Sequence, residues 1–399
     1  MMEGDPRLHA DRRGFLQAGG LTMALAAGGV AAASAPEPAL KPSEFAENPT
    51  AVSSSFSLVN LIELEERARA IIPKGAFDYI ARGAADEWTL AENRAAFSRY
   101  QIVPRNYAGA GGRDLSLELL GSKLTTPVIV APMGVQAIAS RLGEPATAAG
   151  AAAAGALFAY STMSTATIEE FAATHQGPRW FQLYQSDDDG VTRELLQRAR
   201  AAGFTAVIHT LDTIAPGNRD ANVRNRYAWS ASEAPGNFRA QGGRFKPRTD
   251  LGWKDLEFVQ KESGLPVIPK GMLAIEDATR AVSAGAAGLW LSNHGGRALD
   301  GSPAPLTVLP AIADKVAKRV PIIIDGGVRR GQDVYRALAR GASAVAVGRP
   351  IVYALGLGGA TAVEATIRQL TTELSSVMRH TGAATLADIR SGSLVRTTG

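Results

Sequence analysis

The chain has 399 residues, of which 46% are hydrophobic and 20% are charged. This composition is ordinary for a folded globular protein, and the length allows one large domain with a substantial core. The net charge of +4 is spread along the sequence, so a basic nucleic-acid-binding face is not indicated. The absence of cysteine excludes disulfides, thiolate metal sites and a cysteine nucleophile. Redox chemistry would therefore require a bound cofactor.

The amino-terminal segment has the features of an export signal. Two consecutive arginines, Arg12 and Arg13, precede a mildly apolar stretch rich in Ala and Gly. This pattern is typical of a twin-arginine signal peptide, although a surface helix that begins with two arginines is the alternative. We predict a signal peptide over residues 1–35, export to the periplasm, and membrane association if the signal is retained. Residues 36–56, rich in Pro, Ser and Ala, are predicted to be a linker.

From residue 127 onward, short apolar runs alternate with stretches of helical periodicity, as expected for repeated βα units around a parallel sheet. Eight candidate strands begin near residues 128, 156, 180, 206, 266, 288, 321 and 344. Eight units favour a closed α/β (β/α)8 TIM barrel over an open sheet. We predict that this barrel spans residues 127–385 and that residues 386–399 form a carboxyl-terminal tail.

Two further segments flank or interrupt the predicted barrel. Residues 57–126 contain the helical runs LIELEERARAII and FDYIARGA, and we predict an N-terminal helical segment that caps the bottom or side of the barrel.

Residues 216–252, after the fourth strand, are rich in Arg, Gly and Asn and have no clear periodicity. A loop of that length in a compact barrel is usually functional, so we predict a lid over the active site.

Polar residues follow the predicted strands at their carboxyl ends, which form the catalytic face of a (β/α)8 barrel. An isolated polar residue there could belong to a solvated loop, but so many together favour one shared site. They are Ser161, Thr162, Gln182, Tyr184, Thr210, Asp212, Lys270, Ser292, His294, Arg297, Asp325, Arg329, Gly348 and Arg349.

The last two strand ends read IIIDGGVRRG and VAVGRP. Glycine allows backbone N–H groups to approach an anion, and arginine supplies a planar guanidinium fork. Barrels of this kind commonly bind phosphate at these two loops. A single Gly-Gly pair could be ordinary turn chemistry, but its combination with Gly348 and Arg349 after the next strand predicts a phosphate site.

The run SNHGGRALDG places His294 and Arg297 in a glycine-rich loop. Histidine is the natural general base near neutral pH, and arginine can hold a carboxylate through two hydrogen bonds. Asp212, at the end of the fourth strand, could stabilise the protonated imidazole; a buried structural role for His294 is the alternative. We interpret His209, inside an apolar run, as a hydrogen-bonded barrel residue and His175 as a surface residue.

Five segments together carry a resemblance to a known family. FDYIARGAADEWT, GPRWFQLYQ, TLDT followed by GNRDAN, SNHGGRALDG and DGGVRRGQDVYRALARGA closely resemble the FMN-dependent 2-hydroxy-acid oxidases and dehydrogenases. That family includes lactate oxidase, to which the motifs are most similar, glycolate oxidase and mandelate dehydrogenase. The resemblance covers about residues 57–385. It implies FMN as the cofactor, a homotetramer, and oxidation of a small L-2-hydroxy acid, L-lactate first, to the 2-oxo acid.

The resemblance also implies roles for individual residues. The catalytic group would comprise His294 as the base, Asp212 as its orienting partner and Tyr184 as a hydrogen-bond donor to the substrate oxygen. The substrate carboxylate would be held by Tyr79, Arg219 and Arg297. Electrons would pass to flavin N5, with Lys270 beside the N1 and O2 edge. The cofactor contacts would come from Pro132, Met133, Gly134, Ser161, Gln182, Thr210, Lys270, Ser292, Asp325, Gly327, Arg329, Gly348 and Arg349.

Two positions depart from the family pattern. Met163 stands beside the substrate where many relatives have Tyr or Trp, and its flexible thioether could accept a larger apolar substrate. Gly134 stands where alanine is frequent, and we hypothesise that the extra space beside the flavin eases access by oxygen. The electron acceptor stays open between oxygen and a quinone or soluble electron carrier.

Two other functions compete with the oxidation of hydroxy acids. The first is a same-fold FMN enzyme with non-redox chemistry, such as an isomerase of prenyl diphosphates. It would not explain why His294, Arg297 and Arg219 converge on a small carboxylate. The second is an exported binding protein that has lost catalysis, and retention of the whole residue set argues against it. No metal site is predicted.

Overall fold

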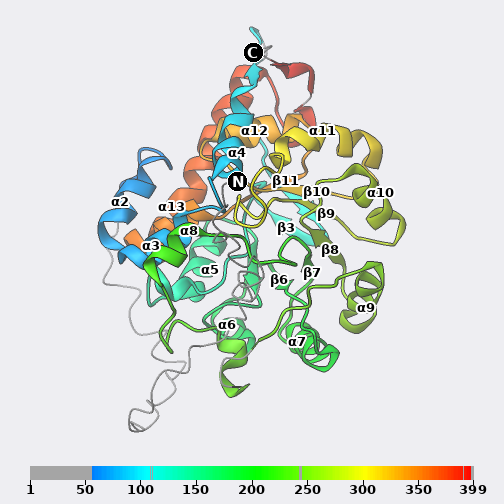
Figure 1. The fold of residues 1–399 in the computed structure, drawn as a ribbon. Helices are drawn as coiled ribbons and strands as arrows, with labels where there is room; N and C mark the ends of the chain where they lie inside the picture. Colours follow the sequence, from blue (N-terminus) through cyan, green and yellow to red (C-terminus); the bar gives the residue numbers. More distant parts are fainter. Residues whose placement is uncertain (1–55, 108, 110, 242–244, 390, 397–399) are drawn as a thin grey trace, which may run out of the picture. The chain divides into compact units, whose positions relative to one another are not determined.

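The computed structural model describes residues 56–107, 109, 111–241, 245–389 and 391–396. The predicted signal peptide and residues 36–55 of the predicted linker lie outside the described residues. Eight parallel strands close into a barrel in the order β10-β11-β4-β5-β6-β7-β8-β9 (Figure 1). The strands are β4 (Val128–Val130), β5 (Phe158–Ser161), β6 (Arg179–Leu183), β7 (Val207–Thr210), β8 (Val267–Lys270), β9 (Leu289–Leu291), β10 (Ile322–Ile324) and β11 (Ala344–Val347). The predicted TIM barrel is confirmed.

Helices surround the barrel, and for this reason its strands are apolar on both faces. Figure 1 shows them as an outer layer around the strands. They are α5 (Gly143–Ala153), α6 (Ile168–Thr174), α7 (Asp189–Ala201), α9 (Trp253–Ser263), α10 (Ile275–Ser283), α11 (Pro305–Val316), α12 (Gly331–Ala339) and α13 (Arg349–Thr381).

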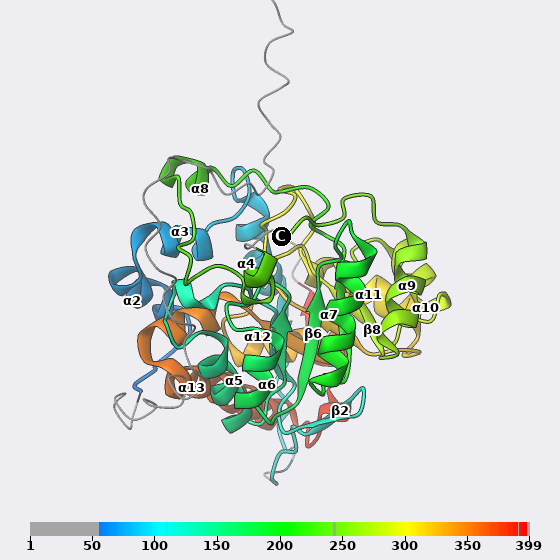
Figure 2. The same cartoon turned by 90° about the horizontal axis from the view of Figure 1, so that it is seen from below.

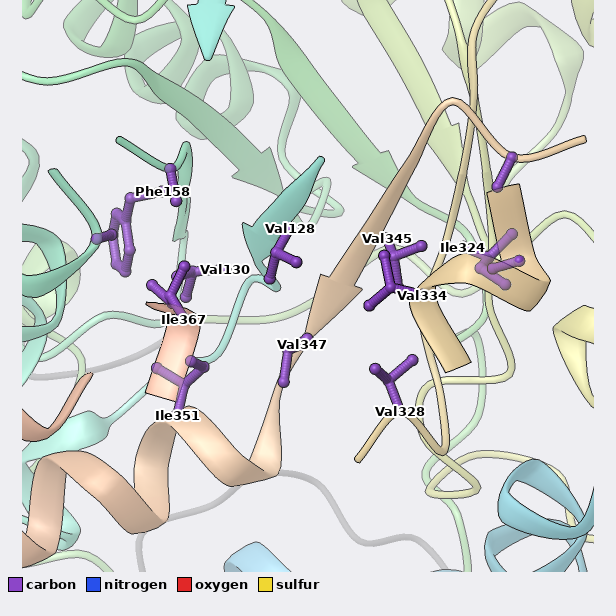
Figure 3. Packing of buried hydrophobic residues seen from close by; sticks show 14 of the residues in the cluster. Val128, Val130, Phe158, Ile324, Val328, Val334, Val345, Val347, Ile351 and Ile367 are labelled. Carbon is purple, nitrogen blue, oxygen red and sulfur yellow. The ribbon is translucent and has the colours of Figure 1, made fainter. Parts of the chain in front are cut away.

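The side chains of each strand alternate between the barrel interior and the helical layer. On β4, Val128 and Val130 belong to the cluster that includes residues of the surrounding helices, among them Ile351 and Ile367 of α13, which Figure 3 shows near Val130. Ile129 belongs to a second buried cluster that fills the interior. This inner cluster also contains Leu157, Trp180, Ile208, Ile268, Trp290 and Ile323.

A short antiparallel hairpin closes the amino-terminal end of the barrel. It consists of β2 (Leu117–Leu119) and β3 (Ser122–Leu124) and directly precedes β4. Leu119 and Leu124 join the inner cluster and are almost completely buried. The hairpin therefore seals the end of the barrel opposite the strand ends that carry the polar residues.

The rest of the segment 57–126 contains α2 (Glu63–Ile71), α3 (Lys74–Ala81), α4 (Trp88–Ser98) and β1 (Tyr100–Ile102). It packs on the outside of the barrel, where α2 contacts α13 and β1 contacts α12, and it reaches the catalytic face through α3, α4 and the loop between them. The backbone N–H of Ala84 donates to Gly296 O in the loop after β9 at 2.8 Å. The segment that we predicted as a helical cap at the bottom or side of the barrel thus also contains three short strands, β1, β2 and β3, and extends to the catalytic face. In the carboxyl-terminal segment, β12 (Leu394–Arg396) pairs antiparallel with β1.

Helix α13 is long and apolar because it is packed within the fold. By length and composition it is the one helix of the described residues that could cross a membrane, but 67% of its apolar window is buried. It bends at Gly358 and Gly359, and Gly359 has a φ of +58°. Its apolar residues are explained by its contacts with α5, α12 and the barrel.

The long connection after β7, the fourth barrel strand, contains the short helix α8 (Asp220–Asn225) and a 3-10 helix at Gly236–Gln241. Figure 2 shows α8 beside α3. Hereafter, the lid means residues 216–252.

Candidate active site

A histidine, an aspartate and a tyrosine meet at the carboxyl ends of three barrel strands. The Nδ1 atom of His294 lies 2.9 Å from Oδ1 of Asp212, and Tyr184 Oη lies 3.3 Å from Nε2 of His294. His294 has a φ of +57° and donates its backbone N–H to Ser292 Oγ at 3.0 Å. A positive φ is uncommon for a residue with a side chain and is found disproportionately at functional sites.

The charges around His294 determine its protonation state. Burial acts to raise the pKa of Asp212, but Lys270 and His294 lower it to about 2. Burial lowers the pKa of His294 below its ordinary value, and Asp212 offsets this only in part. At neutral pH, Asp212 is therefore ionised and the imidazole is neutral. The ionised carboxylate favours a proton on Nδ1, so Nε2 presents a lone pair beside Tyr184.

Lys270 lies between two carboxylates at the end of β8. Its Nζ atom is 3.6 Å from Asp212 Oδ2 and 4.0 Å from Asp325 Oδ2. Burial raises the pKa of Asp325, which accepts hydrogen bonds of 2.9 Å from Ser292 Oγ and Trp290 Nε1. The lysine ammonium is thus held at a fixed place on the floor of the site.

Two guanidinium groups flank one tyrosine ring. Arg219 of the lid and Arg297 of the loop after β9 lie 5.1 and 5.0 Å from the centre of the Tyr79 ring. Arg297 also donates to the backbone carbonyls of Tyr79 and Arg82. Burial, together with the charge of Arg219, lowers the pKa of Arg297 to about 9. Within the described ranges neither guanidinium pairs with a carboxylate, so the two suit an acidic ligand.

A row of buried polar side chains continues the site across β5, β6 and β7. Gln182 accepts a hydrogen bond from Ser161 Oγ and donates one to Thr210 Oγ1, both at 2.8 Å. The Ser161 hydroxyl also accepts the backbone N–H of Met163 at 3.1 Å. These fixed donors and acceptors, with Lys270 on the next strand, could bind the polar edge of a flat heterocycle.

The turn after β4 is packed more tightly than the sequence indicated. A Cβ atom on Gly134 would lie 2.7 Å from both Cβ and O of Met163. The free space that we hypothesised beside Gly134 is therefore filled by Met163. In the same turn, Met133 O accepts a hydrogen bond from Gln136, and Pro132 is partly buried.

The loops after β10 and β11 form a cationic, glycine-rich end of the site. Gly327 has a φ of +81°, and a Cβ atom there would lie 2.0 Å from Asn93 O, so only glycine fits. Burial lowers the pKa of Arg329 to about 10 and also lowers that of Arg349. Gly348 precedes α13, whose amino-terminal end favours an anion.

The buried hydroxyl of Tyr353 indicates whether a phosphate would fit beside the loops after β10 and β11. Tyr353 lies one helical turn after Arg349 on α13, is 1% exposed, and its hydroxyl has no hydrogen-bond partner among the described residues. The charges of Arg349 and Arg329 both act on this hydroxyl. A phosphate between the two arginines would supply the missing acceptor, so the residues present fit a phosphorylated cofactor.

The structure thus brings the residues predicted from the sequence to one face of the barrel. It also shows several contacts that we did not predict from the sequence. Tyr227 and Trp229 of the lid pack against Tyr79 with ring centres 6.0 and 5.8 Å apart. The aromatic run NRYAW in an otherwise polar loop was a signal for this contact. The hydroxyl of Tyr353 gave no signal, because an aromatic residue in an apolar helix predicts packing only.

Two histidine interpretations were wrong. His175 is 3% exposed rather than at the surface, and burial lowers its pKa to about 4. His209 is buried as expected, but neither of its ring nitrogens has a hydrogen-bond partner in the described part of the chain. Burial lowers the pKa of His209 to about 4. Neither residue belongs to the site around His294.

The barrel, the histidine–aspartate pair and the cationic loops together define a class of barrel oxidoreductases that hold a phosphorylated cofactor at the last two strands. Residues 68–396 match the model of the FMN-dependent dehydrogenase family, and the chain belongs to this family. FMN is its cofactor.

Relatives support the same assignment. The chain is 38% identical over 350 residues to L-lactate oxidase of Streptococcus iniae, covering 86% of this chain and 87% of the relative. It is 39% identical to glycolate oxidase 1 of Oryza sativa subsp. indica, covering 83% and 94%. A lactate oxidase structure from Pediococcus acidilactici has a TM-score of 0.84 at 42% identity, covering 87% and 97%. A mandelate oxidase structure has a TM-score of 0.81 at 35% identity, covering 86% and 99%. The resemblance predicted from the sequence is confirmed.

Proposed function

We propose that this chain oxidises a small L-2-hydroxy acid, with L-lactate first among the candidates, to the corresponding 2-oxo acid. One observation carries the proposal. The neutral imidazole of His294, held by Asp212, shares the catalytic face with Arg219 and Arg297, which lack carboxylate partners in the described residues. A base and a carboxylate site on one face suit a substrate with neighbouring hydroxyl and carboxylate groups.

Each side chain has a defined task in this reaction. Arg297 and Arg219 bind the substrate carboxylate beside Tyr79. Tyr184 donates a hydrogen bond to the substrate hydroxyl oxygen, and Nε2 of His294 takes a proton from the substrate. Asp212, ionised at neutral pH, stabilises the imidazolium that results. When bound, FMN supplies the acceptor for the two electrons at N5.

The cofactor would be held at two ends. Lys270 would lie against the ring edge that gains negative charge on reduction, with the polar side chains of β5 to β7 and Ser292 nearby. The turn after β4 would contact the ring through Pro132, Met133 and Gly134. Asp325 would bind the ribityl chain, and the phosphate would be held by Gly327, Arg329, Gly348 and Arg349.

The proposal also covers the preferred substrate, the electron acceptor, the location of the enzyme and its assembly. L-lactate is supported by relatives named lactate oxidases, while the flexible thioether of Met163 would adapt to a larger apolar substrate. Oxygen, or a quinone or soluble carrier of a respiratory chain, reoxidises the enzyme. Export to the periplasm through the twin-arginine signal and assembly into a homotetramer are part of the same proposal.

The test follows the flavin absorbance of the purified holoenzyme without oxygen. We expect loss of the visible flavin band with L-lactate, and a smaller or slower response with glycolate and L-mandelate. Admission of air distinguishes the acceptors, because an oxidase recovers its absorbance and releases peroxide, whereas a dehydrogenase recovers only with a quinone or dye. If no 2-hydroxy acid bleaches the flavin, the proposed function is wrong. Cell fractionation of wild type and of a double Arg12→Lys, Arg13→Lys variant tests export.

A further inference from the structure

Helix α8 carries Arg219 at its amino-terminal cap but has little to hold it in place. It is six residues long, and none of them is buried. A helix this short is not stable by itself in water. Arg226 ends it with a φ of +47°. The position of Arg219 therefore depends on contacts that α8 makes with the rest of the protein.

Three polar side chains attach the carboxyl-terminal end of α8 to α3. Asn225 Nδ2 donates to Asp78 Oδ2 at 2.8 Å, and Lys74 Nζ donates to the same oxygen at 2.6 Å and to Asn225 Oδ1 at 3.1 Å. Asp78 is only 7% exposed. Burial acts to raise the pKa of Asp78, but Lys74 and Asn225 outweigh it and lower the pKa, so this carboxylate is ionised.

Further contacts join the lid to α3 and to the loop that follows α3. Before α8, Asn218 O accepts the backbone N–H of Ala85 at 2.7 Å. After α8, the ring of Tyr227 packs so closely on α3 that a Cβ atom on Gly75 would lie 2.7 Å from it. Gly75 thus allows a close approach that a larger residue would block.

We propose that Asp78 and Asn225 are positioning residues for substrate binding. Their hydrogen bond, reinforced by Lys74, holds α8 on α3 so that Arg219 of the lid and Tyr79 of α3 face the same carboxylate. Asp78 directly precedes Tyr79, so one turn of α3 fixes both the lid and the substrate-binding ring. This inference rests on the proposed function for its substrate.

The chemistry of this contact suits a lid that must open. Lys74 is largely exposed, and Asn225 is partly exposed. Water can therefore satisfy these groups when the lid lifts, whereas an apolar seal would resist opening. A hydrogen bond to a charged group contributes enough that its loss weakens substrate binding by about tenfold.

The experiment compares Asn225→Ala with Arg224→Ala in the full-length holoenzyme. Arg224 is the matched control, because it lies on the same helix and, among the described residues, its one ion pair is with the partly exposed Asp220 at 2.9 Å. Stopped-flow reduction without oxygen gives the Kd for L-lactate, or for the best 2-hydroxy acid found, and the limiting rate. We expect Asn225→Ala to raise the Kd about tenfold and change the limiting rate less than about threefold. Arg224→Ala should match wild type.

A reciprocal exchange separates positioning from general destabilisation. Asp78→Asn combined with Asn225→Asp keeps one amide donor and one carboxylate, so we expect this double variant to recover most of the substrate affinity. If Asn225→Ala leaves the Kd unchanged, or if the exchange fails to restore it while the melting temperature stays at the wild-type value, the proposal is wrong.

A second readout does not depend on the substrate. Amide hydrogen exchange over residues 218–229 should be faster in Asn225→Ala than in wild type and Arg224→Ala, and slow again in the reciprocal variant. Equal exchange in all four proteins would overturn the attachment of α8. If wild type itself is not reduced by any 2-hydroxy acid, the proposed function fails, and this measurement still decides whether the contact holds the lid.

Discussion

Replacing Asp212 with asparagine preserves the shape of the side chain and removes its charge. The wild-type carboxylate accepts a hydrogen bond from His294 at 2.9 Å and lies 3.6 Å from Lys270. A hydrogen bond to a charged group contributes about 1.5–3 kcal/mol, and each 1.36 kcal/mol corresponds to about a tenfold change in rate. Because the charge on His294 develops during proton removal, we expect the limiting rate of flavin reduction to fall roughly 10- to 150-fold.

The same substitution should move the pH dependence in a defined direction. Asp212 raises the pKa of His294, whereas burial lowers it below 6.5. The base acts in its neutral form, so flavin reduction is complete above the pKa of His294 and is lost as the pH falls through it. Wild type should therefore show a midpoint below 6.5, and Asp212→Asn should move that midpoint to still lower pH.

Stopped-flow reduction without oxygen, recorded from about pH 4.5 to pH 8, measures both effects. The control is Asp220→Asn, which removes a carboxylate from the exposed face of α8, and equal flavin absorbance per protein shows that FMN is retained. A limiting rate within twofold of wild type, or a midpoint that moves to higher pH, would refute the role assigned to Asp212.

Three further substitutions test other parts of the site. Arg297→Lys keeps the charge but loses the planar fork, so the Kd for the 2-hydroxy acid should rise about 10- to 100-fold in the same assay. Gly327→Ala would place Cβ 2.0 Å from Asn93 O, so the melting temperature and the FMN content of this variant should fall. The control is Gly301→Ala, which also has a positive φ but whose Cβ would meet no atom within 4 Å, and it should change both quantities far less. Tyr353→Phe should leave the melting temperature of the FMN-free protein unchanged or raise it. Fluorescence titration should show that the same variant binds FMN about tenfold more weakly. An unchanged Kd for FMN would contradict a contact between Tyr353 and the phosphate.

The barrel could be predicted from the sequence because its strands are apolar on both faces and end in polar residues. Lys270 is the last residue of β8, and Asp212 and His294 come two and three residues after β7 and β9, so barrel closure alone brings them together. Prediction of these residues needed no knowledge of side-chain packing. It depended on strand order and on the fact that parallel strands all end on one face.

Other features could not be predicted because they depend on contacts between distant segments. Strands β1 and β12 are three residues each and pair across almost the whole described chain. Strands that short have no periodicity to detect. The space beside Gly134 was wrongly predicted, because the atoms that fill it belong to Met163 on another strand end. The attachment of α8 likewise depends on Asp78, far away in sequence.

The balance of charge on the catalytic face explains why one site suits both a cofactor and a substrate. Five cationic side chains lie there within the described ranges, namely Arg219, Lys270, Arg297, Arg329 and Arg349. Two carboxylates, Asp212 and Asp325, face Lys270, and His294 is neutral. These seven charged groups carry a net charge of three positive, and none of the four arginines forms an ion pair with a carboxylate within the described residues.

A phosphate monoester carries nearly two negative charges at neutral pH, and a hydroxy acid carries one. Bound FMN and one substrate anion together would therefore neutralise this net positive charge. Arg219 and Arg297 flank Tyr79, and Arg329 lies at the loop after β10. Arg349 lies between these two ends, because it donates to Ile80 O and Arg82 O, which also accept from Arg297, while its charge acts on Arg329. Binding of either ligand relieves repulsion among partly buried cations, so each should raise the melting temperature by itself, with the larger increase from FMN.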